Sequence, residues 1–271
     1  MKKDGHVHSP YCPHGSKDSF EEYIQKAVSL GFEEITFTEH APLPKGFIDT
    51  TPTKDSAMDM DQLESYFDDL DRLKTKYEGR IKINIGLEVD YIEGYEEEIR
   101  NFLNVIGERL DDSILSVHFL KFNNRYDCID YSPEEFEKIA KRYGGVDEVY
   151  KKYFGTLMRS ITSDLGPFKP KRIGHITLIR KFHHKFPATH EFKNDVENVL
   201  NTIKKYNYEI DYNGAGTSKP LCREPYPPDW AAEKAMQLGI LLVYGSDAHH
   251  RKELGQGREI MKFLQTGLTQ E

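Results

Sequence analysis

Short apolar runs alternate with amphipathic stretches along almost the whole chain. The strand-like runs are residues 4–9, 34–40, 82–91, 113–119, 171–178, 208–214 and 240–250. Between them, apolar residues recur at helical spacing in stretches such as 19–31, 61–77, 95–110 and 195–207. Strand–helix alternation of this kind predicts an α/β fold with a parallel sheet, either doubly wound or closed into a barrel.

One segment departs from this alternation. After the run 113–119 come two consecutive helical patterns, at 132–144 and 145–166. They predict a helical insertion at about 132–166 that covers one mouth of a barrel. We find no internal repeat and no linker long enough to divide the chain, so residues 1–271 are expected to form a single domain.

Polar residues stand repeatedly at the C-terminal ends of the strand-like runs. They are His6, His8, His40, Glu88, His118, His175, Asn213, Asp247 and His249. In a closed β/α barrel all strands point the same way, so these ends meet at one rim, where such barrels place their chemistry. Seven strand-like runs favour an incomplete or distorted TIM-like barrel over the ordinary eight-stranded one, with its site at this rim.

The spacing of these residues indicates metal binding. Side chains alternate along a strand, so His6 and His8 face the same side. Asp247 and His249 do the same if the extended conformation continues through them. These two pairs meet only if the first and last strands are neighbours, which barrel closure supplies. A single histidine in a strand is usually a packed or surface residue. The many histidines at the strand ends, together with Glu88 and Asp247, instead predict a site for several metals.

The loop after the first run offers two further ligands. His14 would reach back toward the rim, and Cys12 could compete with it. Pro10 and Pro13 bend this loop, so the sequence leaves open which side chain points inward. Because no second thiol accompanies Cys12, a packed role for Cys12 and a ligand role for His14 are favoured.

Composition narrows the class of protein. The formal net charge of −8 argues against a nucleic-acid groove, which normally shows a basic stripe. Three widely spaced cysteines without a CxxC motif indicate reduced thiols. No apolar run reaches the ~18 residues of a membrane span. We expect a cytoplasmic protein with no membrane or nucleic-acid partner, and the oligomeric state stays open.

The motifs at these positions resemble a known family. "HVHSPYCPHG", "TEH", "GLEVDY", "SVHF", "IGH" and "GSDAH" are similar to the successive metal-binding motifs of the polymerase and histidinol phosphatase (PHP) superfamily. The flanks "TEHAPLP", "GLEVDYI", "SVHFL" and "KPLCREPYP" resemble its monofunctional histidinol-phosphate phosphatases. The resemblance runs from Gly5 to about His249.

The resemblance implies a (β/α)7 barrel that hydrolyses L-histidinol phosphate, a small molecule, to L-histidinol and phosphate in histidine biosynthesis. It implies up to three divalent metals in three sets: His6, His8, Glu88 and Asp247; Glu88, as a bridge, with His118 and His175; and His14, His40 and His249. Glu88, Asp247 and His249 are also expected to be catalytic. Zinc, iron and manganese all suit such imidazole and carboxylate ligands.

The charges of these groups fit a phosphate ester. Neutral imidazoles and only two carboxylates would leave three divalent cations with an excess of about four positive charges, which suits a phosphate dianion. Glu39 or Asp90 could pair with the ammonium of the substrate. Arg159 or Arg223 could bind its phosphate bidentately, although an ordinary surface position is as good an interpretation of either arginine.

Three rival functions remain open at this point. A PHP-type phosphoesterase acting on nucleotides or other small phosphate esters would be favoured by a basic, aromatic-lined groove. A non-catalytic, metal-stabilised domain would have lost ligands, and none is missing here. A metal-dependent amide hydrolase on a similar barrel usually has a bridging lysine, and no strand end offers one.

Overall fold

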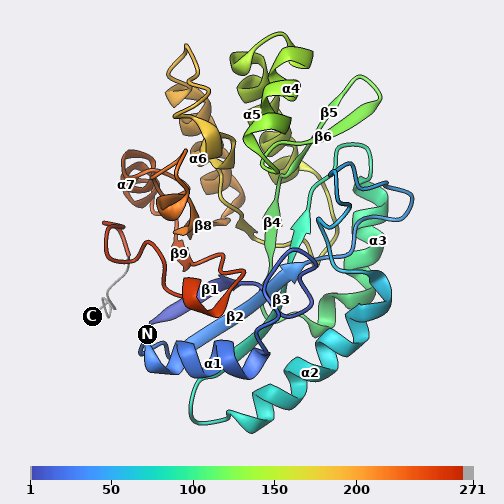
Figure 1. Cartoon of the computed structure of the whole chain (residues 1–271), viewed down its shortest axis with the longest axis vertical. Coiled ribbons are helices and arrows are strands. Elements are labelled where there is room, and N and C mark those ends of the chain that lie inside the picture. The colour runs from blue at the N-terminus through green and yellow to red at the C-terminus, as the bar shows by residue number, and fades with distance from the viewer. Residues whose placement is uncertain (1, 265–271) are drawn as a thin grey trace.

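Seven parallel strands form the centre of the molecule in the computed structural model, which describes residues 2–264 (Figure 1). They are β1 (Lys3–Val7), β2 (Glu34–His40), β3 (Lys82–Asp90), β4 (Ile114–Ser116), β7 (Arg172–Ile173), β8 (Glu209–Asn213) and β9 (Leu242–Gly245). The sheet order is β1-β2-β3-β4-β7-β8-β9. A parallel bridge between Val7 and Ala248 brings its two edges together. The predicted distorted seven-stranded barrel is therefore confirmed.

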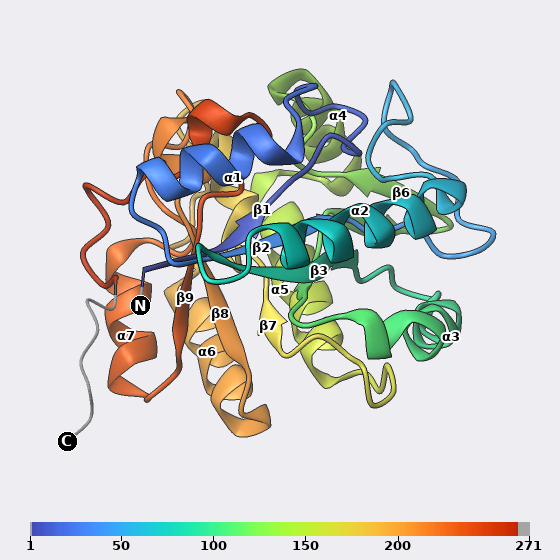
Figure 2. The same cartoon turned by 90° about the horizontal axis from the view of Figure 1, so that it is seen from below.

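Helices surround the strands, as two perpendicular views show (Figures 1 and 2). They are α1 (Phe20–Ser29), α2 (Leu63–Lys76), α3 (Glu96–Ile106), α4 (Pro133–Tyr143), α5 (Val146–Thr162), α6 (Lys193–Tyr206) and α7 (Asp229–Gln237). The expected boundaries of α1 are present, because Ser19 forms a capping box with Glu22 and Gly31 adopts a φ of +74°. None of the described helices is long and apolar enough to cross a membrane.

The barrel interior is polar at both ends. In the register of β2 against β3, His40 pairs with Glu88, so the two side chains start at the same height near the C-terminal rim. Toward the opposite end the fully buried Arg172 donates to Asp112 at 2.8 Å. The apolar residues of the strands pack outward against the helices, which leaves the inner rim to polar groups.

The segment between β4 and β7 contains more secondary structure than the sequence predicted. The predicted helices are α4 and α5, but a hairpin of β5 (Phe119–Phe122) and β6 (Arg125–Cys128) precedes them. Its turn contains Asn123 with a φ of +55°, a conformation that asparagine tolerates. Helix α5 packs against α6 and contacts β4, so it also covers the barrel wall.

Helix α7 was not predicted at all. Its buried side chains are alanines, at positions 231, 232 and 235. Alanines give a weak apolar pattern, which explains why helical periodicity did not reveal this helix.

Candidate metal centre

The nine predicted ligands meet at the C-terminal rim of the barrel. Seven of them line one cavity of about 410 Å³: His14, His40, Glu88, His118, His175, Asp247 and His249. His6 and His8 lie fully buried beside this cavity. The strand ends thus bring together residues that are up to 243 positions apart in the sequence, from His6 to His249.

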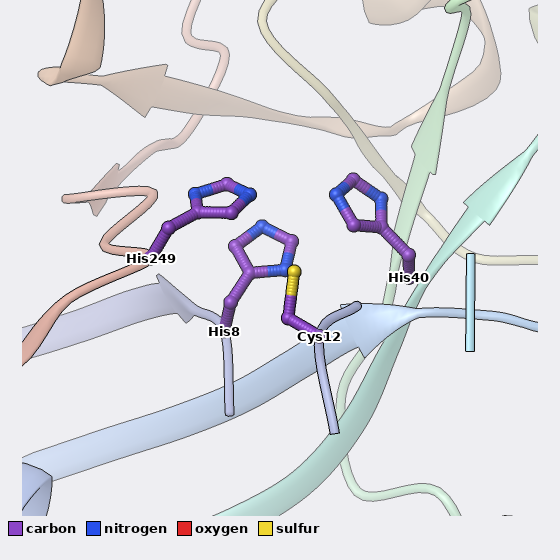
Figure 3. Close-up of side chains that lie close together, drawn as sticks. All are labelled: His8, Cys12, His40 and His249. Atoms are coloured by element: carbon purple, nitrogen blue, oxygen red, sulfur yellow. The ribbon is translucent and has the colours of Figure 1, made fainter. Parts of the chain in front are cut away.

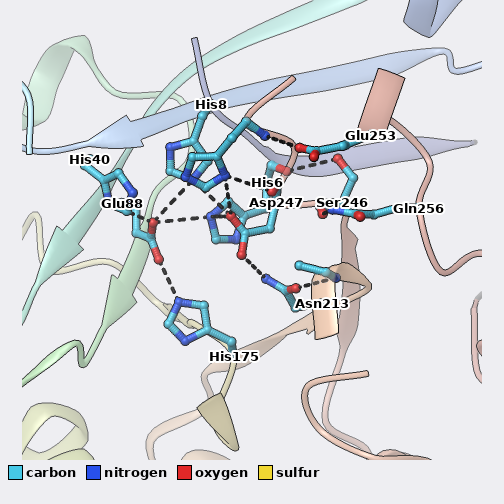
Figure 4. A network of polar contacts seen from close by, with 12 residues as sticks. His6, His8, His40, Glu88, His175, Asn213, Ser246, Asp247, Glu253 and Gln256 are labelled. Atoms are coloured by element: carbon cyan, nitrogen blue, oxygen red, sulfur yellow. Dashed lines mark hydrogen bonds and ion pairs between the residues drawn. The ribbon is translucent and has the colours of Figure 1, made fainter. Parts of the chain in front are cut away.

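Glu88 stands between two groups of histidines (Figure 4). Its Oε1 lies 2.8 Å from His175 Nε2 and 3.7 Å from His118 Nε2. Its Oε2 lies 3.4 Å from His6 Nε2 and 3.6 Å from His8 Nε2. A carboxylate whose two oxygens face separate donor groups has the geometry of a bridge between two cations.

Beside Glu88, donor atoms of His6, His8 and Asp247 all lie within 4.8 Å of one another. Asp247 Oδ1 lies 3.6 Å from His6 Nε2 and 3.1 Å from His8 Nε2, and Glu88 Oε2 completes the group. Donors at tetrahedral corners about 2.0–2.1 Å from a metal lie about 3.3 Å from one another. The four separations between a ring nitrogen and a carboxylate oxygen, 3.1–3.6 Å, are of this size, so this group could hold a metal ion.

A further group of side chains lies close together at this rim (Figure 3). Its donor atoms all lie within 4.8 Å of one another and belong to His8, Cys12, His40 and His249. The ring of His14 stands close by, with its centroid 5.1 Å from that of His40 and 4.9 Å from that of His249. His14 Nδ1 is 2.7 Å from a backbone carbonyl oxygen, which leaves Nε2 available. Both Cys12 and His14 are thus within reach of this group.

Two buried carboxylates orient histidines of the site. Glu39 Oε1 is 3.1 Å from His8 Nδ1, and Asp90 Oδ1 is 2.8 Å from His118 Nδ1. Such bonds fix which ring nitrogen is free to bind a metal. Asp90 also lines the cavity, whereas Glu39 does not.

A third orienting carboxylate, Asp211, was missed by the sequence analysis. Asp211 Oδ2 lies 2.8 Å from His6 Nδ1 and accepts a bond from Asn213 Nδ2 at 3.0 Å. A Cβ at Gly245 would lie 2.4 Å from Asp211 Oδ1, so this contact requires a glycine in β9. The available signal was the spacing of Asp211 and Asn213, two positions apart on one face of β8.

Several ring nitrogens of the site have no hydrogen-bond partner within residues 2–264. They are His6 Nε2, both nitrogens of His40, and His175 Nδ1, all buried. A buried polar atom left without a partner costs about 1–3 kcal/mol. A divalent cation would satisfy His6 Nε2 and one nitrogen of His40, so the residues present fit a metal centre.

Nearby carboxylates change the pKa of two histidines of the site. Burial opposes protonation of these imidazoles, but hydrogen bonds to Asp247 and Glu39 raise the pKa of His8 to about 9. Asp90 and Glu88 likewise raise the pKa of His118 to about 10 against the effect of burial. Metal ligation requires neutral imidazole, so metal uptake must release protons here.

Asp247 and His249 reach the site by a route that differs from the prediction. Strand β9 ends at Gly245, and Asp247 has a φ of +53°, so the extended conformation does not continue through the motif. The bend is held by Asp247 N, which donates to His6 O at 2.7 Å. The expected strand alternation is wrong at this point, but the side chains still converge: His249 Nδ1 lies 3.6 Å from Asp247 Oδ1.

Neither arginine expected to bind substrate lies at the cavity. The side chain of Arg159 is 63% exposed and lies 3.8 Å from Glu93. Arg223 is exposed on the loop after β8. The cations that line the cavity are Lys181 and Lys219, which sequence reasoning missed because neither stands at a strand end.

Comparison with known proteins gives consistent matches. The PHP domain family matches residues 4–215. The chain is 45% identical to a histidinol-phosphatase of Bacillus subtilis, with 96% of this chain and 97% of that protein covered. A structure from Listeria monocytogenes, described as that of a candidate histidinol phosphatase, is 40% identical with a TM-score of 0.92 and covers 95% of this chain and 99% of its own. The histidinol phosphate phosphatase of Lactococcus lactis, solved with zinc, L-histidinol and phosphate, shares the fold at a TM-score of 0.70 and 19% identity, covering 96% and 92%.

Proposed function

The chain belongs to the PHP domain family, and from that premise we propose that it is a histidinol-phosphatase, hydrolysing L-histidinol phosphate to L-histidinol and phosphate. The observation that carries this proposal is the position of Glu88, with one oxygen toward His118 and His175 and the other toward His6 and His8. The full-length likeness to a histidinol-phosphatase supports the substrate.

We propose that the nine rim residues hold up to three metals. The sets are His6, His8, Glu88 and Asp247; Glu88, His118 and His175; and His14, His40 and His249. Zinc is the metal proposed, because imidazole with carboxylate suits it and because the Lactococcus lactis enzyme was solved with it. Iron and manganese would suit the same donors, so metal analysis of the purified protein decides the identity and the number.

Divalent metals, when bound, would neutralise charge on the phosphate oxygens and lower the pKa of water so that hydroxide forms near neutral pH. The chain supplies the geometry for this chemistry. Asp211, Glu39 and Asp90 hold the rings of His6, His8 and His118 in fixed orientations. Since these partners are buried, the rings need little rearrangement when the transition state forms.

The test is release of inorganic phosphate from L-histidinol phosphate, nucleoside monophosphates and sugar phosphates by metal-loaded protein. We expect kcat/KM for L-histidinol phosphate to exceed the other values by orders of magnitude. Comparable values across the panel would favour a general PHP-type phosphoesterase. No phosphate release by protein with full metal content would contradict phosphatase activity altogether.

The remaining parts of the proposal concern the whole chain. We propose a cytoplasmic enzyme of one domain, residues 1–271, with a helical insertion at about 132–166. The packing of α4 on α5 supports the insertion as one unit.

A further inference from the structure

A partly buried ion pair in the cavity wall belongs to none of the proposed metal groups. Lys181 Nζ donates to Asp130 Oδ2 at 2.9 Å, and the two side chains are 23% and 19% exposed. Both residues line the same cavity as the proposed metal ligands. An ion pair taken out of water is a poor source of stability, because desolvation offsets the attraction. Stability alone therefore does not explain this ion pair, and its position at the cavity suggests a role in binding a ligand.

The main chain ties each member of the pair to a proposed ligand. The backbone N–H of the residue before Asp130 donates to His118 O at 3.0 Å. Lys181 belongs to the 3₁₀ helix η3 (Leu178–Phe182), whose first N–H donates to His175 O at 2.8 Å. The pair thus stands beside the metal group that contains His118 and His175.

Both members have unused hydrogen-bonding capacity. Within residues 2–264, Lys181 Nζ donates to Asp130 alone, which leaves two of its three N–H bonds for a molecule in the cavity. A carboxylate accepts about four hydrogen bonds, and in the described part of the chain Asp130 accepts those from Lys181 and from Cys128 Sγ, the latter at 3.3 Å. The burial of Asp130 opposes ionisation, but Lys181 lowers its pKa, so the carboxylate stays charged.

The other cavity carboxylates outside the proposed metal groups are not paired with a lysine of the cavity. Asp90 is engaged by His118, through both Nδ1 and the backbone N–H. Glu253 accepts from the backbone N–H of His249 at 3.1 Å, and Asp55 accepts from Thr53 Oγ1. Among residues 2–264, Asp130 is therefore the cavity carboxylate at which a ligand with opposite charges meets both a carboxylate and a lysine.

We propose that Lys181 and Asp130 form the specificity pair of the site, with Lys181 binding the phosphate and Asp130 the neighbouring ammonium of a 2-amino-alkyl phosphate. This inference rests on the proposed function and names the residues that select its substrate. Such a substrate carries its own opposite charges two carbons and one ester oxygen apart. When the substrate lies antiparallel to the ion pair, its phosphate faces Lys181 and its ammonium faces Asp130. Asp130 thereby takes the role that the sequence suggested for Glu39 or Asp90.

The test compares L-histidinol phosphate with its deamino analogue, 3-(imidazol-4-yl)propyl phosphate. The wild-type protein is expected to prefer the amine in kcat/KM by about 10- to 100-fold, the range of a hydrogen bond to a charged group. Asp130→Asn should reduce this preference to about twofold or less, chiefly by lowering kcat/KM for the amine. Lys181→Met should lower kcat/KM for both substrates by similar factors and keep the preference.

Controls separate recognition from folding. Asp55→Asn removes one charge from the same cavity and should leave the preference intact. The double variant Lys181→Met with Asp130→Asn keeps the charge balance, and thermal unfolding of all variants reports their stability. Binding of L-histidinol, measured by calorimetry, should weaken about tenfold or more in Asp130→Asn but not in Asp55→Asn.

The outcomes distinguish this inference from the proposed function. If the wild-type protein hydrolyses L-histidinol phosphate and folded Asp130→Asn keeps the preference for the amine, the specificity pair is refuted while the function stands. A wild-type protein that does not distinguish the two substrates also refutes it. If the wild-type protein hydrolyses neither, the proposed function itself fails.

Discussion

Glu88→Gln is the most informative single substitution, because Glu88 is the residue proposed to serve two metals. Glutamine keeps the shape and can still accept the hydrogen bond that Ser116 Oγ donates at 2.6 Å. It replaces one charged oxygen by an NH₂ group, which donates and cannot ligate a metal. Whichever way the amide is turned, one of the two histidine groups then faces a donor instead of an acceptor.

The expected loss follows from the two contacts of Glu88. Removing one preorganised group that stabilises transition-state charge costs about 2.7–4 kcal/mol, or roughly 10²- to 10³-fold in kcat. Glu88 faces two donor groups, at 2.8–3.7 Å through Oε1 and at 3.4–3.6 Å through Oε2, and its Oε2 also lies 3.2 Å from His40 Nδ1. Contributions that act as a unit do not add fully. We therefore expect kcat to fall at least ~10³-fold at saturating substrate.

Metal analysis and kinetics together test this reasoning. Elemental analysis of Glu88→Gln should show depleted metal at two of the three proposed positions, with the His14, His40 and His249 position less affected. Glu253→Gln makes the same chemical change at the cavity rim and should retain more than about a tenth of kcat, since its amide oxygen can still accept from the His249 N–H. Near-normal kcat with full metal content in Glu88→Gln would refute the bridge.

Three further predictions concern other parts of the molecule. Asp211→Asn should weaken metal affinity about 10- to 100-fold by releasing the ring of His6, which is measurable by competition with a chelator; unchanged affinity would contradict an orienting role. His14→Ala should remove one metal, whereas Cys12→Ser should not; thiolate-to-cobalt absorption in cobalt-loaded wild-type protein would instead identify Cys12 as a ligand. Burial lowers the pKa of Lys169 from 10.5 to about 8, so the unfolded chain binds more protons between these values and the free energy of unfolding should rise with pH there. Urea unfolding of metal-free protein at both ends of this window should show a smaller rise in Lys169→Met, and an equal rise would show that Lys169 is not the cause.

The barrel and its rim could be predicted because both depend on local pattern and on a simple geometric rule. Alternating strands and helices leave few topologies, and parallel strands place every C-terminal end at one rim. His40 and Glu88 illustrate this rule, since the parallel register of β2 and β3 sets them side by side. A prediction of this kind needs only the position of a residue within its strand.

Residues outside the strands could not be placed in the same way. Asp247 reaches the site through a left-handed backbone conformation that no periodicity encodes. Lys181 and Asp130 lie on a 3₁₀ helix and after a hairpin, and their meeting depends on how two separate loops pack. Arg159 and Arg223 resembled phosphate ligands by residue type, but neither lines the cavity: Arg159 lies in α5 and Arg223 on the loop after β8. The rim of a barrel is fixed by its strands, whereas its loops determine which substrate charges find a partner. The metal ligands of such a chain can therefore be predicted from its sequence, whereas the residues that select its substrate require the structure.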